Sequence, residues 1–138
     1  MRITRRGLAS LAFAAAAVPA RAAMPPWIDA HAHAFVRGLK LAVDARYAPT
    51  YDAAWETLLK LAETNGVGRT VLLQPSFLGY DNSYLFDALK AAPQRFRGVP
   101  WISPSVEIRP EDWEEMARIG VRGLRFPILG LPTPQWSA

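Results

Sequence analysis

From residue 27 to residue 129 the sequence alternates between short apolar runs and longer segments with helical periodicity. Four apolar runs bounded by turn residues are typical of strands buried in a sheet. They are residues 27–33, 68–76, 95–104 and 121–129. Apolar positions three and four apart, with capping residues at the ends, predict three intervening helices. These are residues 51–66, 81–93 and 109–120.

This β-α-β-α-β-α-β order predicts an α/β fold with a parallel sheet, either doubly wound or a (β/α)8 barrel, because each crossover returns the chain in the same direction. No strand is followed by a glycine-rich nucleotide loop, so the nucleotide-binding folds lose support. A closed barrel takes about 250 residues. If the fold is a barrel, we expect residues 23–138 to be the N-terminal part of one domain, about four β/α units, truncated before closure.

The first 22 residues form a pattern of their own. An arginine-rich start precedes an apolar run over 8–18, and Ala20-Arg21-Ala22 offers small residues for cleavage. The apolar run is too short for a bilayer span, which needs about 20 residues. Arg5-Arg6 resembles a twin-arginine signal. We therefore expect a signal peptide over residues 1–22, export to the periplasm, and no stable membrane span; a frayed N-terminal extension is the alternative.

Charge and cysteine content exclude several classes of partner. The chain has 16 basic and 12 acidic residues, but four of the basic ones lie in the expected signal: Arg2, Arg5, Arg6 and Arg21. The rest is formally neutral and holds no basic cluster with interleaved aromatic residues, which argues against nucleic-acid binding. No cysteine is present, so disulfides, thiolate nucleophiles and cysteine-bound metals are excluded.

The segment IDAHAHAF contains the two histidines of the chain, His31 and His33. Strand alternation predicts that they share one face with Asp29, which lies one pleat deeper. Two imidazoles at the carboxyl end of a strand can converge on one ligand. A catalytic zinc takes three protein ligands, and the sequence has no third histidine. We interpret the pair as pocket residues without a metal and Asp29 as a hydrogen-bonding residue; divalent-metal ligation, with zinc as the example, is the alternative.

Several blocks together resemble one family. IDAHAHAF, ARYAPTYDA, LLQPSFLGYDNSYLFDAL and the FRGV and GVRGLRF segments are similar to the amidohydrolase-related family, in its branch of 2-pyrone-4,6-dicarboxylate hydrolase-like lactonases. The resemblance runs from about Trp27 to Leu129. It implies a (β/α)8 barrel of metal-dependent-hydrolase type and hydrolysis of a lactone or related cyclic carboxylic acid, without a required metal. It also implies that further histidines and a catalytic aspartate come from later strands, beyond Ala138.

The resemblance also assigns roles. His31 and His33 would polarise the substrate carbonyl, while Tyr47, Ser76 and Arg125 would bind substrate. We place Ser76 at the end of the second strand on the face of Gln74. Alternation places Arg125 on one face with residues 121 and 123.

This sequence departs from the lactonase pattern at two positions. Pro127 and Leu131 stand where that branch has an asparagine and a further basic residue. The loss of one cation puts a substrate with two carboxylates in doubt, and a less charged lactone fits as well.

Two classes of function remain open from the sequence. One is an exported hydrolase acting on a small carboxylate or lactone, or a metal-dependent decarboxylase or hydrolase of the same superfamily. The other is a catalytically silent truncated fragment. Half a parallel barrel leaves sheet edges unpaired, so self-association through those edges is expected in either case.

We predict that changing Arg5→Lys and Arg6→Lys together blocks export, because the paired arginines are what twin-arginine transport reads. Periplasmic and cytoplasmic fractions are compared by immunoblot. Normal periplasmic accumulation of the double variant would reject this export route.

Overall fold

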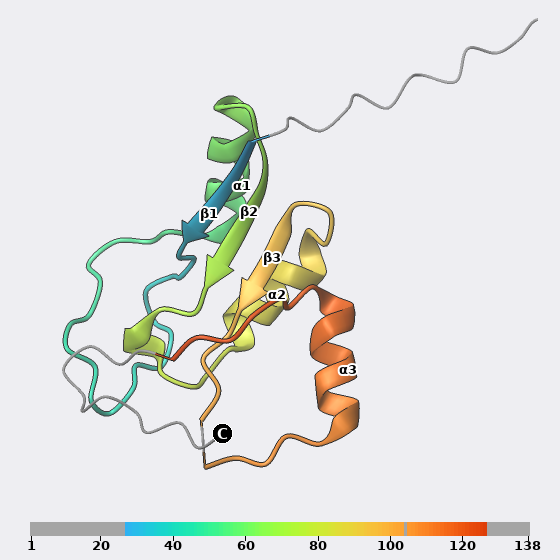
Figure 1. Cartoon of the computed structure of the whole chain (residues 1–138). Helices are drawn as coiled ribbons and strands as arrows, with labels where there is room; N and C mark the ends of the chain where they lie inside the picture. The colour runs from blue at the N-terminus through green and yellow to red at the C-terminus, as the bar shows by residue number, and fades with distance from the viewer. Residues whose placement is uncertain (1–26, 104, 127–138) are drawn as a thin grey trace, which may run out of the picture.

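The computed structural model describes residues 27–103 and 105–126, so the expected signal peptide lies outside the described residues. Strands and helices alternate along the chain as the sequence predicts (Figure 1). The elements are β1 (Trp27–Ala32), α1 (Trp55–Thr64), β2 (Val67–Leu73), the short 3-10 helix η1 (Ser76–Leu78), α2 (Ser83–Ala91), β3 (Phe96–Val99) and α3 (Pro110–Ile119). No helix of the described part is long and apolar enough to cross a bilayer.

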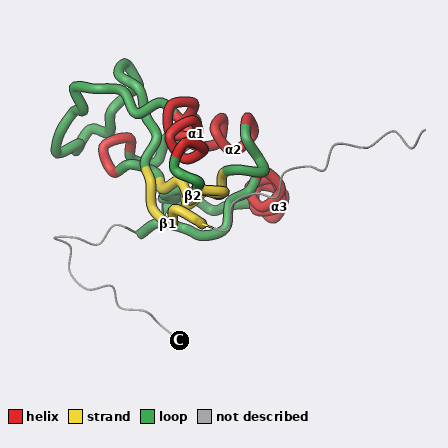
Figure 2. The backbone as a smooth tube through the Cα atoms, turned by 90° about the horizontal axis from the view of Figure 1, so that it is seen from above, coloured by secondary structure: helices red, strands yellow, loops and turns green. Residues whose placement is uncertain are grey.

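The three strands form one parallel sheet in the order β1-β2-β3. Figure 2 shows α1 and α2 together on one side of the strands. On that side Leu72 and Phe96 are fully buried against Leu89 of α2. Gly98 allows this close approach, since a Cβ there would lie 2.5 Å from Leu89 Cδ1. We call this side of the sheet the helix face and the other side the open face.

Within the described residues the predicted fourth strand is present only as two isolated parallel bridges, one to β3 and one to the segment that follows β3. Gly98 pairs with Val121, and Trp101 pairs with Arg125. Between these two bridges, two residues of the β3 segment lie opposite three residues of the fourth segment. Val121 is buried in the core on the helix face. The extra residue between the two bridges turns Arg125 away from that face. The prediction that 121, 123 and 125 share a face is therefore wrong for Val121. Residues 127–129 lie outside the described part.

A bulge also interrupts β1. Asp29 pairs with Thr70 and Ala32 with Leu72, so between these pairs two residues of β1 lie opposite one residue of β2. Thr70 and Leu72 are both buried on the helix face, and this register assigns Asp29 and Ala32 to that face. The prediction that Asp29 shares a face with the histidines is wrong, because the bulge breaks the two-residue alternation.

The second strand ends earlier than the sequence predicts. β2 stops at Leu73, Gln74 is buried, and Ser76 opens η1 with an exposed side chain. Pro75 has no backbone N–H and cannot extend the ladder. Ser76 therefore does not lie on the face of Gln74, contrary to the prediction.

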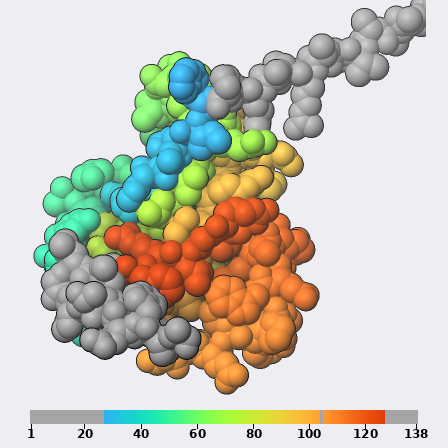
Figure 3. Space-filling model, in the orientation of Figure 1, coloured from blue at the N-terminus to red at the C-terminus, as the bar shows by residue number. Residues whose placement is uncertain are grey.

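Among the described residues β1 has a partner strand on one side only. Trp27 and Ile28 are 72% and 58% exposed. Figure 3 shows the atoms of β1 uncovered on this face of the molecule. An apolar, unpaired parallel strand is a template for pairing with another chain.

We expect this chain to self-associate through β1, and Ile28→Lys to shift it toward the monomer, because a charged side chain on an edge strand opposes strand pairing. Light scattering after size exclusion measures the mass. Leu61→Lys is the matched control, since Leu61 is also 58% exposed but belongs to the helix α1 rather than to the edge strand. A monomeric wild-type chain would refute the expectation.

Candidate active site at the carboxyl ends of the strands

The two histidines meet at the carboxyl end of β1. Their rings are perpendicular, and the two Nε2 atoms lie 3.4 Å apart. His33 Nδ1 lies 2.8 Å from the carbonyl oxygen of Leu73 at the end of β2. A carbonyl only accepts, so Nδ1 of His33 carries a proton and donates it. In the neutral ring Nε2 of His33 is then an acceptor, and His31 Nε2–H is the group that can donate to it.

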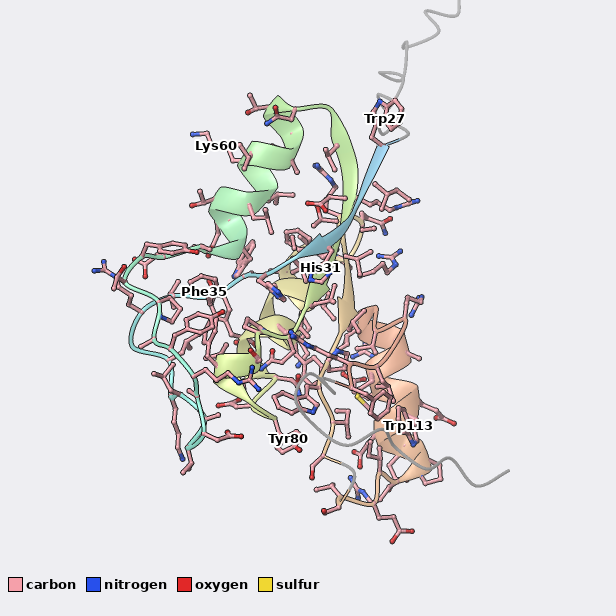
Figure 4. The ribbon with its side chains drawn as sticks, turned by 60° about the vertical axis from the view of Figure 1, so that its left-hand side comes forward. Trp27, His31, Phe35, Lys60, Tyr80 and Trp113 are labelled. Carbon is pink, nitrogen blue, oxygen red and sulfur yellow. The ribbon has the colours of Figure 1, made fainter. Side chains whose placement is uncertain are left out.

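Local structure holds this pair in place. The backbone N–H of His31 donates to Asp29 Oδ1 at 3.1 Å, which satisfies an amide at the bulge. Asp29 thus has the hydrogen-bonding role expected of it, although from the other face. Figure 4 shows His31 where β1 gives way to the following loop.

Burial keeps the His33 imidazole neutral. Desolvation lowers the pKa of His33 below its usual value of 6.5, and the positive charges of Arg125 and His31 lower it further. The hydrogen bond to the Leu73 carbonyl opposes this shift of the pKa without cancelling it. At neutral pH His33 therefore offers an unprotonated Nε2.

Arg125 lies close enough to both His33 and Tyr47 to influence them electrostatically. Its Nη1 donates to the carbonyl oxygen of Gln74, and its backbone N–H donates to Pro100 O at 2.8 Å. Partial burial lowers the pKa of the guanidinium, which still remains charged. A partly desolvated cation beside an imidazole is suited to binding a carboxylate.

Two buried amides fix the loop between β2 and α2. Gln74 Nε2 donates to Gly79 O at 3.2 Å and to Asp81 O at 2.7 Å. Asn82 bonds twice to the backbone of Trp101: its Nδ2 donates to the carbonyl oxygen, and its Oδ1 accepts from the N–H, both at 3.0 Å. Gly79, at φ 58°, closes the turn. Sequence reasoning did not identify Asn82 as a residue that organises the site; its position in the loop after a buried strand was the available signal.

Tyr47 is held by a long loop that leaves β1 and returns to α1. Phe35 and Ala53 pair as an antiparallel bridge at the base of this loop, with both N–H groups donating at 2.9 Å. Phe77 of η1 contacts the rings of Tyr47 and Phe35, each at 5.1 Å between centroids. Tyr47 and His33 thereby line one hollow of about 390 Å³.

Ser76 and Arg125 line a second, larger hollow of about 670 Å³. Its remaining walls come from the Tyr47 loop, from the β2–α2 loop and from Trp101. Five candidates from distant parts of the sequence therefore gather where the strands end. They are His31, His33, Tyr47, Ser76 and Arg125.

The histidine pair also fits two positions of a metal site. Two nitrogens bound at 2.0–2.1 Å to one tetrahedral zinc lie about 3.3 Å apart, close to the 3.4 Å between the two Nε2 atoms. Within residues 27–103 and 105–126 no group of three His, Cys, Asp or Glu side chains can hold a metal ion. The described residues thus supply two ligands.

Comparison with known proteins gives this arrangement a family context. The family described as Amidohydrolase matches residues 28–138. A 2-pyrone-4,6-dicarboxylate hydrolase of Comamonas testosteroni is 33% identical over 101 residues, which are 72% of this chain and 32% of that protein.

Two crystal structures resemble the fold. A candidate 2-pyrone-4,6-dicarboxylic acid hydrolase of Acinetobacter baumannii, solved with citric acid bound, has a TM-score of 0.72 and 29% identity, over 79% of this chain and 40% of that one. A second candidate, of Pseudomonas putida, has a TM-score of 0.67 and 48% identity, over 78% and 38%. This chain spans about a third to two fifths of its relatives' length. The prediction that it forms the first part of a (β/α)8 barrel is confirmed.

We predict that His33 titrates below pH 6.5 and that it makes the fold less stable in acid. With its pKa lowered in the folded state, the unfolded chain takes up the proton first as the pH falls. This contribution to stability is complete above pH 6.5 and is lost as the pH falls from 6.5 through the folded-state pKa. NMR titration of the imidazole C–H signals measures the pKa, and urea unfolding at several pH values measures the stability.

His33→Gln should remove that part of the pH dependence, while the control His31→Gln should keep most of it. A His33 pKa at or above 6.5 would contradict the burial argument.

Proposed function

Because the chain belongs to the amidohydrolase family, we propose that it forms the carbonyl-polarising and carboxylate-binding part of a lactonase active site of the 2-pyrone-4,6-dicarboxylate hydrolase type. The observation that carries the proposal is the placement of His31, His33 and Arg125 together at the carboxyl ends of parallel strands. This edge is where (β/α)8 barrels place their reacting groups. The similarity to the Comamonas testosteroni enzyme supports the same reaction class.

Lactone hydrolysis needs a water nucleophile, a base, and donors for the oxyanion that forms when water attacks the carbonyl carbon. His31 Nε2–H is the hydrogen-bond donor that the pair offers. A substrate oxygen that enters between the rings accepts this hydrogen bond in place of His33 Nε2. His33, fixed through Leu73, keeps the pair at the correct place. In this proposal the base that accepts the water proton is an aspartate on a later strand of the family fold.

Carboxylate binding falls to Arg125, with Ser76 of the same hollow and Tyr47 of the smaller hollow as hydroxyl donors. The Arg125 guanidinium uses Nη1 to bond Gln74 O, and this bond orients the side chain. The Acinetobacter baumannii relative was solved with citric acid, a polycarboxylate, bound, which supports a carboxylated ligand. We propose a carboxylated lactone as substrate, bound through at least one carboxylate.

A chimera tests this function. Residues 27–126 replace the corresponding segment of the Comamonas testosteroni enzyme, and hydrolysis of 2-pyrone-4,6-dicarboxylate is followed by absorbance. We expect turnover, a loss of about 100-fold or more in kcat on His31→Ala, since oxyanion donors contribute that much, and a raised KM on Arg125→Met. Lys60→Ala on the outer helix α1 is the control. A chimera that melts cooperatively but does not hydrolyse the lactone would refute the proposal.

A metal-dependent reaction of the same superfamily is the second candidate, favoured by the 3.4 Å separation of the Nε2 atoms. His31 and His33 would hold the ion, which when bound would polarise a carbonyl or activate water. Two imidazoles leave most coordination positions to solvent, so we expect weak zinc binding by the whole chain in calorimetry. A submicromolar one-to-one site abolished by His31→Ala would instead establish the metal-dependent reaction.

We also propose that the protein works in the periplasm, on the basis of the twin-arginine pattern of residues 1–22. The export assay of the paired arginine variant tests this localisation.

A further inference from the structure

The larger hollow contains an aromatic pair that the proposed chemistry does not use. Tyr80 and Trp101 have ring centroids 4.7 Å apart, with planes tilted by 57°. Both line the hollow together with Arg125 and Ser76. Tyr80 lies on the β2–α2 loop (Figure 4), whereas Trp101 follows β3. The pair thus joins two loops at one wall.

The backbone of Trp101 is fixed unusually well for a residue beyond a strand end. The side chain of Asn82, itself buried, forms hydrogen bonds with both the N–H and the carbonyl oxygen of Trp101, each at 3.0 Å. The bridge from Trp101 to Arg125 ties the same residue to the carboxylate-binding cation. Because its backbone is held in this way, Trp101 lines the hollow with less conformational entropy left to lose on binding than a residue of a free loop.

The charges of the hollow favour an anion. Lys40, Arg46 and Arg125 line it together with Asp44 and Asp81. Asp81 is turned toward α2, where its Oδ1 accepts hydrogen bonds from the Ser83 N–H and hydroxyl. The aromatic wall and the surrounding cations together select a ligand that is both flat and negatively charged.

We propose that Trp101, backed by Tyr80 and flanked by Arg125, is the ring-binding wall of this hollow and selects a flat carboxylated ring over an open-chain carboxylate. The inference deepens the proposed lactonase function, since a pyrone dicarboxylate is such a ring. It makes Trp101 a specificity-determining residue that touches the substrate. It also gives a reason why Leu131 can stand where the lactonase branch has a basic residue. Stacking on Trp101 contributes affinity that a second carboxylate-binding cation would otherwise supply.

The test is the binding of two unreactive probes to the whole chain by calorimetry. Isophthalate is a flat ring with two carboxylates, and tricarballylate is an open-chain carboxylate. We expect Trp101→Leu to weaken isophthalate binding about tenfold, the scale of one stacking contact, and to leave tricarballylate binding unchanged. Trp101→Phe keeps a ring and should stay within about threefold of wild type. Trp113→Leu, which alters an exposed tryptophan of α3, is the control.

Three results would overturn the inference: Trp101→Leu weakens the binding of both probes equally, Trp101→Leu leaves isophthalate binding unchanged, or the wild-type chain does not bind isophthalate. If Trp101→Leu does not fold, NMR of the wild-type indole N–H signals decides, with Trp101 assigned from Trp101→Phe. Isophthalate must shift the Trp101 signal and leave that of Trp113 in place; the reverse refutes the proposal. If the chimera binds isophthalate in preference to tricarballylate but does not hydrolyse the lactone, the lactonase function is rejected while the ring-binding site stands.

Discussion

Gln74, the residue that follows β2, is the junction on which the candidate site depends. Its backbone N–H donates to Val99 O of β3, and its carbonyl accepts from Arg125. Its side-chain amide holds the carbonyls of Gly79 and Asp81. One buried residue thereby joins the sheet, Arg125 and the loop between β2 and α2. Removing the side chain would leave buried carbonyls without donors, at about 1–3 kcal/mol each.

The histidine pair depends on a second constraint, the mismatch between β1 and β2. The bulge moves Asp29 to the helix face and leaves His31 and His33 together on the open face. Leu73 then fixes the tautomer of His33, and burial keeps its ring neutral. A pair with one donor and one acceptor between its facing Nε2 atoms can polarise a carbonyl or hold part of a metal site, and the same geometry serves both chemistries.

Sequence patterns predicted the order of elements and the location of the site well, and they failed where the backbone departs from regular alternation. The three helices and the first three strands match the segments that apolar periodicity indicated, whereas the fourth strand is reduced to isolated bridges. The errors concern Asp29, Ser76 and Val121. Each lies next to a bulge or a proline, and one extra residue reverses every side chain that follows. Long-range hydrogen bonds set such shifts, and local sequence does not encode them.

The sequence by itself determined the α/β class, the position of both histidines at a strand end, and the family to which the motifs belong. It did so because periodicity, turn residues and short motifs are local properties of the chain. Only the tertiary structure decided that Arg125 lies near His33, that Asn82 holds Trp101, and that Tyr47 and Ser76 line different hollows. These relations join residues 19 to 92 positions apart, from the Asn82–Trp101 pair to the His33–Arg125 pair. Strand register and loop packing set them, and both are fixed only when the whole sheet assembles.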